Sequence, residues 1–458
     1  MRKAALHNLG CKVNAYETEA MQQMLEDAGY EIVPFKEGAD VYVINTCSVT
    51  NVADKKSRQM LHRAKKMNPS AVVVAAGCYV QAAGEELLKD EAVDIVVGNN
   101  RKQDLVSILD QYFAEHQGVE NIIDIGKTGE YEPLHIRKIS DHTRAFIKVQ
   151  DGCNQFCSYC IIPYTRGRVR SRQMEDVVRE VEELAASGYK EIVLTGIHLS
   201  SYGVDFKEEN IGLLDLIVRL DQVPGVERIR LGSLEPRIIT EEFAGTLAGL
   251  KSFCPHFHLS LQSGCDETLK RMNRHYTTED YAHRCEILRK YFENPAITTD
   301  VIVGFPQETE EEFETTREFL RRIHFYEMHV LNIPGERGQG PLSWKAQVPE
   351  QEKNRRSDIL LDLEAELSSA YRRSFLGKEE EVLLEERVSA EGRDYMIGHT
   401  RQYVKAVVPY REGLKNVTVR GKLERMVTDE ILLFGRGIEP ACCLKKYFSC
   451  RMGYFGLE

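Results

Sequence analysis

The sequence predicts an α/β protein in three parts: an amino-terminal α/β domain with a parallel sheet, a partial (β/α)6 barrel, and a small carboxy-terminal β-barrel. Residues 1–98 repeat a unit of apolar strand, cysteine and helix, residues 143–330 alternate strands and helices, and residues 376–437 return to short alternating runs. We expect domains at 1–115, 143–372 and 373–437, a linker at 116–142, and an atypical cysteine-containing tail at 438–458.

The composition is that of an ordinary globular protein, with 458 residues, 42% hydrophobic residues and a formal net charge of −11. No apolar run approaches the roughly 20 residues that cross a bilayer. The first residues turn polar at once, so we expect no signal peptide, no membrane partner and a cytoplasmic location. Twelve cysteines in a reducing compartment indicate metal ligands rather than disulfides.

In the first domain, three apolar runs each end in a small residue followed by a cysteine: Cys11, Cys47 and Cys78. The carboxyl ends of parallel strands meet at one edge of a sheet, where ligands bind. We therefore expect the three thiols to converge on a three-ligand metal site with one position free. The alternative is that they are core residues, but core cysteines should fall within strands rather than just past their ends.

The second cysteine set follows the predicted strand 144–150 and has the spacing C-x3-C-x2-C: Cys153, Cys157 and Cys160. Three neighbouring thiolates can hold three corners of a [4Fe–4S] cluster and leave one iron open. Zinc or three unrelated core cysteines are the alternatives. Zinc requires a fourth Cys or His at short spacing, and the next histidine, His198, is far off in sequence.

The predicted barrel strands end in polar residues, at the edge where β/α barrels carry their function. We predict cofactor-binding residues at these strand ends, namely Thr195, Gly196, Glu235, Gln262, Asp300 and Gly304. Glu235 could accept hydrogen bonds from ribose hydroxyls, and the backbone at Gly304 could approach adenine closely. The alternative is that glycine and proline mark turns here and that Glu235 only begins a helix.

Two basic stretches suggest a nucleic-acid partner in spite of the acidic total charge. Between Arg393 and Arg425 there are eight Lys or Arg against three acids, and arginines alternate from Arg166 to Arg172. An extended segment with alternating arginines would place one charged row on one face. The RNA contacts that we predict are Arg166, Arg168, Arg170, Lys405, Arg420 and Lys422. A solvated surface is the alternative.

Five motifs together resemble the radical S-adenosylmethionine (SAM) methylthiotransferases, over nearly the whole chain. They are LGCKVNAYETE at 9–19, INTCSVT at 44–50, AAGCYVQ at 75–81, the loop at 151–172, and VIVGFPQETEEEF at 301–313. The resemblance implies two [4Fe–4S] clusters, SAM, a tRNA-binding TRAM barrel, and a reductase or a flavodoxin- or ferredoxin-type electron donor.

In the mechanism that the resemblance implies, Cys153, Cys157 and Cys160 hold the cluster that cleaves SAM to a 5′-deoxyadenosyl radical. Cys11, Cys47 and Cys78 hold an auxiliary cluster, which carries the sulfur that is transferred. An aryl C–H bond is too inert for acid–base attack, so a radical is required.

Within this family, LGCKVN, TGIHLSSYG (195–203) and IGHTRQYVKA (397–406) resemble most the members that methylthiolate carbon 2 of N6-threonylcarbamoyladenosine next to the tRNA anticodon. The isopentenyladenosine enzymes usually carry a Gln-Met-Asn version of the first motif, and the ribosomal-protein enzymes a Pro-Lys-Asn version. Isopentenyladenosine and a ribosomal-protein aspartate are the alternative substrates. An iron–sulfur RNA-binding regulator without turnover is the alternative from another class.

Two segments depart from the family pattern. Residues 331–346 are rich in Gly and Pro, and one choice of codons read one base earlier restores the family sequence at the same length. We hypothesise a pair of compensating single-base shifts. The alternative is a divergent loop, and resequencing of the gene region distinguishes the two. The tail at 438–458 holds three more cysteines, which we interpret as a non-catalytic extension because they lie outside the strand-end pattern.

Overall fold

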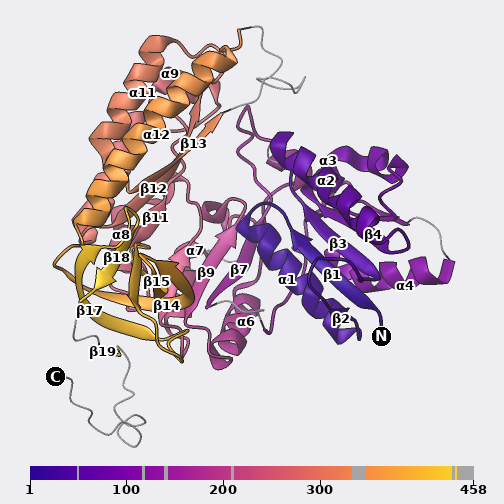
Figure 1. Ribbon diagram of the computed structural model, residues 1–458. Coiled ribbons are helices and arrows are strands. Elements are labelled where there is room, and N and C mark those ends of the chain that lie inside the picture. Colours follow the sequence, from indigo (N-terminus) through magenta and orange to yellow (C-terminus); the bar gives the residue numbers. More distant parts are fainter. Residues whose placement is uncertain are drawn as a thin grey trace, which may run out of the picture.

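The computed structural model describes residues 1–48, 51–115, 119–138, 143–207, 211–332, 346–435 and 439–440. It contains an amino-terminal α/β domain, a central core and a small β-barrel, and the core lies between the other two (Figure 1). The α/β fold class is confirmed. Among the described residues, none of the helices has the length and apolar character needed to cross a membrane.

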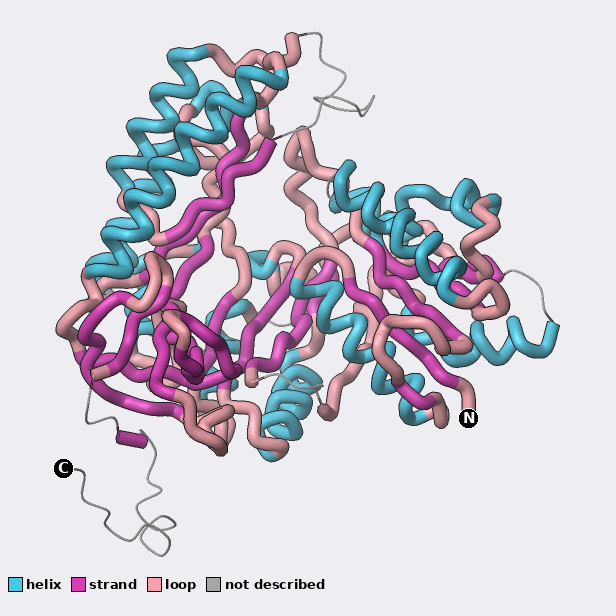
Figure 2. The backbone as a smooth tube through the Cα atoms, viewed as in Figure 1, coloured by secondary structure: helices cyan, strands magenta, loops and turns pink. Residues whose placement is uncertain are grey.

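The amino-terminal domain is a six-stranded parallel sheet with strand order β2-β1-β3-β4-β5-β6. Both faces are covered by helices (Figure 2). Its central strands read as continuous apolar runs because they are buried on both faces. The strands are β1 (Lys3–Asn8), β2 (Glu31–Ile32), β3 (Val41–Thr46), β4 (Val72–Gly77), β5 (Ile95–Val97) and β6 (Val119–Asn121). The helices are α1 (Lys12–Asp27), α2 (Asn51–Met67), α3 (Cys78–Ala83) and α4 (Leu105–Glu115).

The stretch predicted as a linker, 116–142, is more than a connection, which corrects the expected boundary. It supplies β6, which pairs with β5 at the edge of the first sheet. Leu134 and Ile136 from the same stretch are buried in the hydrophobic cluster of the central core. Polar composition hid both features, because an edge strand of three residues gives almost no periodic signal.

The central core places six parallel strands in chain order. Hydrogen bonding joins β10-β9-β7 and β11-β12-β13, and isolated parallel bridges at Ile229–Phe253 and Leu234–Leu259 connect the two halves. The strands are β7 (Arg144–Asp151), β9 (Glu191–Gly196), β10 (Arg228–Leu231), β11 (His256–His258), β12 (Ala296–Val303) and β13 (Glu327–Asn332). An additional short strand, β8 (Arg170–Ser171), pairs antiparallel to the end of β7.

The helices of the core follow the sequence signals closely. The helix predicted behind Thr309 begins there with a capping box, in which the Thr309 hydroxyl and the Glu312 carboxylate satisfy each other's backbone N–H groups. The helices are α5 (Ile162–Thr165), α6 (Met174–Ala186), α7 (Leu213–Asp221), α8 (Glu241–Ala248), α9 (Asp266–Arg271), α10 (Thr278–Tyr291), α11 (Glu310–Ile323) and α12 (Glu350–Arg373).

The carboxy-terminal domain is a closed barrel, because β14 pairs with both β15 and β17. Its strands are β14 (Glu379–Ala390), β15 (Arg393–Thr400), β16 (Lys405–Pro409), β17 (Thr418–Met426) and β18 (Ile431–Phe434), with β19 (Glu439–Pro440) added beside β17. The barrel packs at the amino ends of the core strands, where Arg228 of β10 donates to the carbonyl of His399 (2.7 Å). Residues 333–345 and the tail beyond residue 440 lie outside the described residues, so both hypotheses about them stand untested.

Candidate active site

The three amino-terminal cysteines lie at one edge of the first sheet, as the strand pattern predicts. Cys47 directly follows β3 and Cys78 directly follows β4, and the preceding residues, Thr46 and Gly77, are register partners. Cys11 caps the start of α1, three residues past β1. Gly10 has a φ of +105°, and a Cβ on it would lie 2.8 Å from the Cβ of Cys47, so only glycine permits this approach.

Two asparagines that the sequence did not single out hold this site. Asn14, on the first turn of α1, donates to the carbonyls of Leu9 (2.8 Å) and Thr46 (3.0 Å) and accepts from the Cys11 thiol (3.7 Å). Asn99 donates to the Cys78 sulfur (3.6 Å). Asn14 belongs to the LGCKVN motif, which was a usable signal, whereas Asn99 reaches the site only through the fold.

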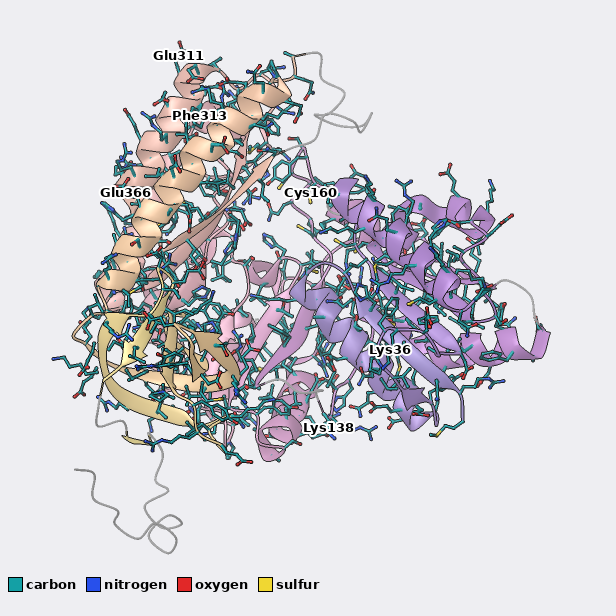
Figure 3. All side chains as sticks on the ribbon, viewed as in Figure 1. Lys36, Lys138, Cys160, Glu311, Phe313 and Glu366 are labelled. Carbon is teal, nitrogen blue, oxygen red and sulfur yellow. The ribbon has the colours of Figure 1, made fainter. Side chains whose placement is uncertain are left out.

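The second cysteine set lies on the loop after β7. Gly152 opens the loop with a φ of +71°, and a Cβ there would lie 1.8 Å from the carbonyl oxygen of Arg168. The Cys160 N–H donates to the Cys157 carbonyl (2.9 Å), and Arg274 donates to the Cys157 sulfur (3.2 Å). Burial raises the pKa of the Cys160 thiol to about 12. Figure 3 shows Cys160 on the side of the core that faces the amino-terminal domain.

The spacing of the sulfurs is compatible with a cluster. Among the described residues, neither cysteine set brings three ligand atoms within 4.8 Å of one another. One zinc ion would draw its ligands to such short separations. A [4Fe–4S] cube binds each thiolate on a different iron, so it accommodates the wider spacing.

The two cysteine sites adjoin each other. Arg166 donates from Nε to the Cys78 sulfur (3.3 Å), and the carbonyl of the next residue, Gly167, accepts from the Cys153 N–H (3.0 Å). Asn99 also bridges them, because it donates to the carbonyl of Thr165 (2.7 Å) as well as to Cys78. Residues 165–167 are therefore a shared wall between the sites.

Beneath this wall lies a buried ion network that joins α1 to the core. Glu17 of α1 pairs with Arg166 (2.5 Å), Lys148 (2.8 Å) and Lys102 (3.1 Å). Burial alone would raise the pKa of Glu17, but these three cations hold it well below its usual value. The network contains four cations and three acids, all nearly or fully inaccessible: Lys102, Lys148, Arg166 and Arg170 with Glu17, Glu132 and Asp151.

This network has one more cation than acids. That charge shows whether the residues present are suited to hold an iron–sulfur cluster. Arg166 is fully buried and points its Nε at the Cys78 sulfur. A buried uncompensated charge is costly, so the network requires a negative group at this position. Cluster-bound thiolates supply negative charge there, and the residues present therefore fit an iron–sulfur group.

The prediction of one exposed arginine row is wrong for most of its members. Arg166 and Arg170 are fully buried in the network, and Arg172 pairs with the buried Glu180. Only Arg168 is exposed, with its guanidinium 4.5 Å from the ring centre of Phe156. The segment turns at Gly167 (φ +70°) instead of running extended, so its side chains do not alternate as in a strand.

The predicted basic residues of the small barrel remain compatible with an RNA surface. Arg420 and Lys422 are exposed and lie two residues apart on β17, so they share one face. Lys405 is half-buried and pairs with the exposed Glu430 (2.8 Å). Their contact with RNA stays a prediction.

The predicted cofactor residues lie at or beyond strand ends, with one exception. Thr195 and Gly196 end β9, and Gln262 follows β11 with a φ of +72°. Asp300 lies inside β12, three residues before its end. Both carboxylate oxygens of Glu235 accept from Arg237 (2.7 and 3.2 Å), so they are already engaged by the protein.

Gly304 is required for a reason other than the predicted one. Its φ is +67°, and a Cβ there would lie 2.3 Å from the Lys353 side chain of α12. Helix packing therefore explains the glycine, and its approach to adenine stays a prediction.

Asp300 belongs to a cluster that the sequence did not reveal. Its carboxylate accepts from His258 Nε2 (3.2 Å), and His258, Asp300 and His329 bring one ligand atom each within 4.8 Å of one another. The other ring nitrogen of His258 lies 3.0 Å from the Thr298 hydroxyl. Three adjacent strands supply these groups, and no spacing along the chain could have linked them.

Comparisons with known proteins agree with this architecture. Residues 3–98 match the uncharacterized protein family UPF0004, and residues 147–320 match the radical SAM superfamily. A threonylcarbamoyladenosine tRNA methylthiotransferase of Bacillus subtilis is 42% identical over 94% of this chain and 98% of its own length. The chain belongs to the radical SAM tRNA methylthiotransferase family. Because the members of this family are enzymes, the alternative that the protein is an iron–sulfur RNA-binding regulator without turnover is excluded.

Other relatives show how narrow the distinction within the family is. A threonylcarbamoyladenosine tRNA methylthiotransferase of Aquifex aeolicus is 39% identical over 93% of this chain and all of its own length. A tRNA-2-methylthio-N(6)-dimethylallyladenosine synthase of Moorella thermoacetica is 35% identical over 92% of this chain and 95% of its own length. Among solved structures, the radical SAM methyltransferase TsrM of Kitasatospora setae has a TM-score of 0.55 at 19% identity, covering 72% of this chain and 73% of that one. That likeness supports the fold alone.

Proposed function

We propose that this enzyme methylthiolates carbon 2 of N6-threonylcarbamoyladenosine beside the anticodon of tRNA, with two [4Fe–4S] clusters and SAM. The observation that carries the proposal is the pair of adjoining three-cysteine sites, linked through Arg166 and Gly167. Two open clusters close together suit a reaction that activates a C–H bond and delivers sulfur to the same carbon. The names of the relatives support the choice of nucleoside.

In this reaction the residues of the chain would hold the two clusters and tune their potentials. Cys153, Cys157 and Cys160 would hold the SAM-binding cluster, and Cys11, Cys47 and Cys78 the auxiliary one. Reductive cleavage of SAM is the chemistry that the first cluster supplies when bound. Arg166 and Arg274 each donate a hydrogen bond to one cysteine sulfur, and such bonds tune the potential of a cluster.

The remaining partners follow from the proposed reaction. Exposed Arg168, Arg420 and Lys422 are the basic groups that we assign to the tRNA backbone. A flavodoxin- or ferredoxin-type protein or a reductase would supply the electron. A cytoplasmic location, predicted from the sequence, fits a tRNA substrate.

Nucleoside mass spectrometry of tRNA tests the proposal. A strain lacking the gene should accumulate unmodified threonylcarbamoyladenosine and lose its 2-methylthio form, and the wild-type gene should restore it. A Cys11, Cys47, Cys78 triple alanine variant should not. Loss of methylthiolated isopentenyladenosine instead would favour the dimethylallyl reaction named for some relatives.

A further inference from the structure

Three side chains with metal-ligating atoms meet on the central core: His258 of β11, Asp300 of β12 and His329 of β13. One ligand atom of each lies within 4.8 Å of the other two. In the part of the chain that the structure describes, no other three His, Cys, Asp or Glu side chains come as close together. This group is therefore the strongest candidate for a further metal site, apart from the two sets of cysteines.

The strand pairing holds the three residues on one face of the sheet. Asp300 and His329 are register partners on β12 and β13. His258 is the register partner of Thr298, which lies two residues before Asp300 on β12. Side chains two residues apart along a strand point to the same face. Hydrogen-bonded strands thus place all three groups, and strands hold a site more precisely than loops do.

The other face of these strands is apolar. Phe257, Val301 and Met328, each next to one of the three residues in sequence, are buried in the hydrophobic cluster that includes side chains of α11 and α12. The imidazole of His258 and the carboxylate of Asp300 are partly buried, and His329 is exposed. The three polar groups therefore point away from the helices, to a face of the core that solvent reaches.

The separations suit ligands of one ion. Nε2 of His258 and a carboxylate oxygen of Asp300 are 3.2 Å apart. Two ligand atoms bound to one tetrahedral or octahedral ion, each at about 2.0–2.2 Å, lie roughly 3–3.5 Å from each other. The ring centres of His258 and His329 are 5.9 Å apart, so the second imidazole approaches the same point.

Thr298 supports the histidine of β11. Its hydroxyl lies 3.0 Å from Nδ1 of His258. A neutral imidazole carries one N–H, and when Nδ1 donates it to Thr298, the lone pair of Nε2 faces the Asp300 carboxylate. A cation between these two electron-rich groups is then favourable. Histidine ligands of metal ions usually have such a partner on the second ring nitrogen, which fixes the tautomer.

We propose that His258, Asp300 and His329 bind one divalent transition-metal ion, separate from the two iron–sulfur clusters. Two imidazoles and one carboxylate suit zinc or non-haem iron(II), whereas magnesium and calcium prefer oxygen ligands alone. Three protein ligands leave at least one position open to water or another oxygen donor. The inference is independent of which nucleoside is modified, and it assigns Asp300 to the ion instead of the predicted cofactor contact.

Zinc is the probe in the test, because elemental analysis distinguishes it from the iron of the clusters. Full-length enzyme with both clusters reconstituted is freed of loosely bound metal on a chelating resin and dialysed anaerobically against zinc. We expect one zinc ion per chain and an unchanged iron content. X-ray absorption at the zinc edge should show nitrogen and oxygen ligands at about 2.0–2.2 Å and no sulfur at about 2.3 Å.

Two variants test the residues. His329→Ala removes an exposed ligand and should weaken zinc binding about 100-fold or more, since loss even of an outer partner costs about 10–100-fold. Thr298→Val removes such an outer partner and should fall within that smaller range. His283→Ala is the matched control, because His283 is an exposed histidine of α10, 3.8 Å from Glu286. It should bind zinc like wild type, and melting temperatures verify that all variants fold.

The wild-type measurements need no variant to decide against the inference. Absence of bound zinc in wild type, or sulfur among the zinc ligands, overturns it, and so does zinc binding that His329→Ala leaves unchanged. Zinc held by nitrogen and oxygen alone, and weakened in His329→Ala but not in His283→Ala, supports it.

Discussion

The two cysteine sites reach a similar three-thiol arrangement by opposite routes. Cys153, Cys157 and Cys160 lie on one loop, whose shape depends on Gly152 and on local backbone hydrogen bonds. Cys11, Cys47 and Cys78 follow the ends of three adjacent strands, β1, β3 and β4, so their convergence requires the parallel sheet. The loop site can be predicted from the spacing of its cysteines along the sequence alone. The sheet site can be predicted only if the order of the strands in the sheet is assumed.

The two sites also differ in what stabilises them. The sheet site rests on a fully buried ion network around Glu17, which spans two domains. The loop site has one partly buried arginine, Arg274, which also bonds to the hydroxyl of Tyr276 (3.0 Å). Damage to the domain interface should therefore affect the auxiliary site first.

The largest effect is expected from removing either cysteine set. Each triple alanine variant should lose about four of about eight irons and all methylthiolation. The two should differ in one respect: only the Cys153, Cys157, Cys160 variant should lose reductive SAM cleavage, measured as 5′-deoxyadenosine. Loss of SAM cleavage in the Cys11, Cys47, Cys78 variant would show that the sites are not separate in function.

Glu17→Gln tests the buried network. Removing one partner of a buried ion pair leaves uncompensated charge, so we expect a destabilisation of roughly 3–5 kcal/mol in urea unfolding. Auxiliary iron should fall with it. Asp124→Asn breaks an exposed pair with Lys127 and should leave the unfolding midpoint almost unchanged. Equal effects of both changes would contradict the assigned importance of burial.

Substitution of two glycines should disturb the two cysteine sites one at a time. Gly152→Ala meets the backbone oxygen of Arg168 at 1.8 Å and should reduce iron at the loop site, whereas Gly10→Ala meets Cys47 and should reduce iron at the sheet site. Gly188→Ala is the control, since Gly188 has a φ of +96° and nothing within 4 Å. It should cost about 1–2 kcal/mol from the left-handed conformation alone and leave iron content unchanged.

The smallest effect concerns RNA binding near the loop site. Arg168→Ala should weaken tRNA binding a few-fold and reduce the slope of log K against log salt by about one, as loss of a single phosphate contact implies. Arg179→Ala, an exposed arginine of α6, is the control and should leave the slope unchanged. A slope that Arg168→Ala leaves untouched would remove this residue from the tRNA surface.

Much of the fold was predictable because its signals are local. The strand–cysteine repeats gave the parallel sheet, and the caps at Thr309 and Gly188 gave helix ends. The edge strand β6 was not predicted because its three residues, Val119–Asn121, are too few to show a periodicity. The roles of the arginines could not be predicted, since an alternating charge pattern looks the same for an exposed strand and for a turn that buries its side chains.

By itself, the sequence determined the division into three domains, the two cysteine sets and the family resemblance, because these depend on spacing and on periodicity along the chain. Only the tertiary structure decided that residues 165–167 lie between the two sites and that Arg166 bonds to Cys78. These contacts join residues of different domains. Their burial and charge balance arise only when α1 packs against β7, which no local pattern encodes.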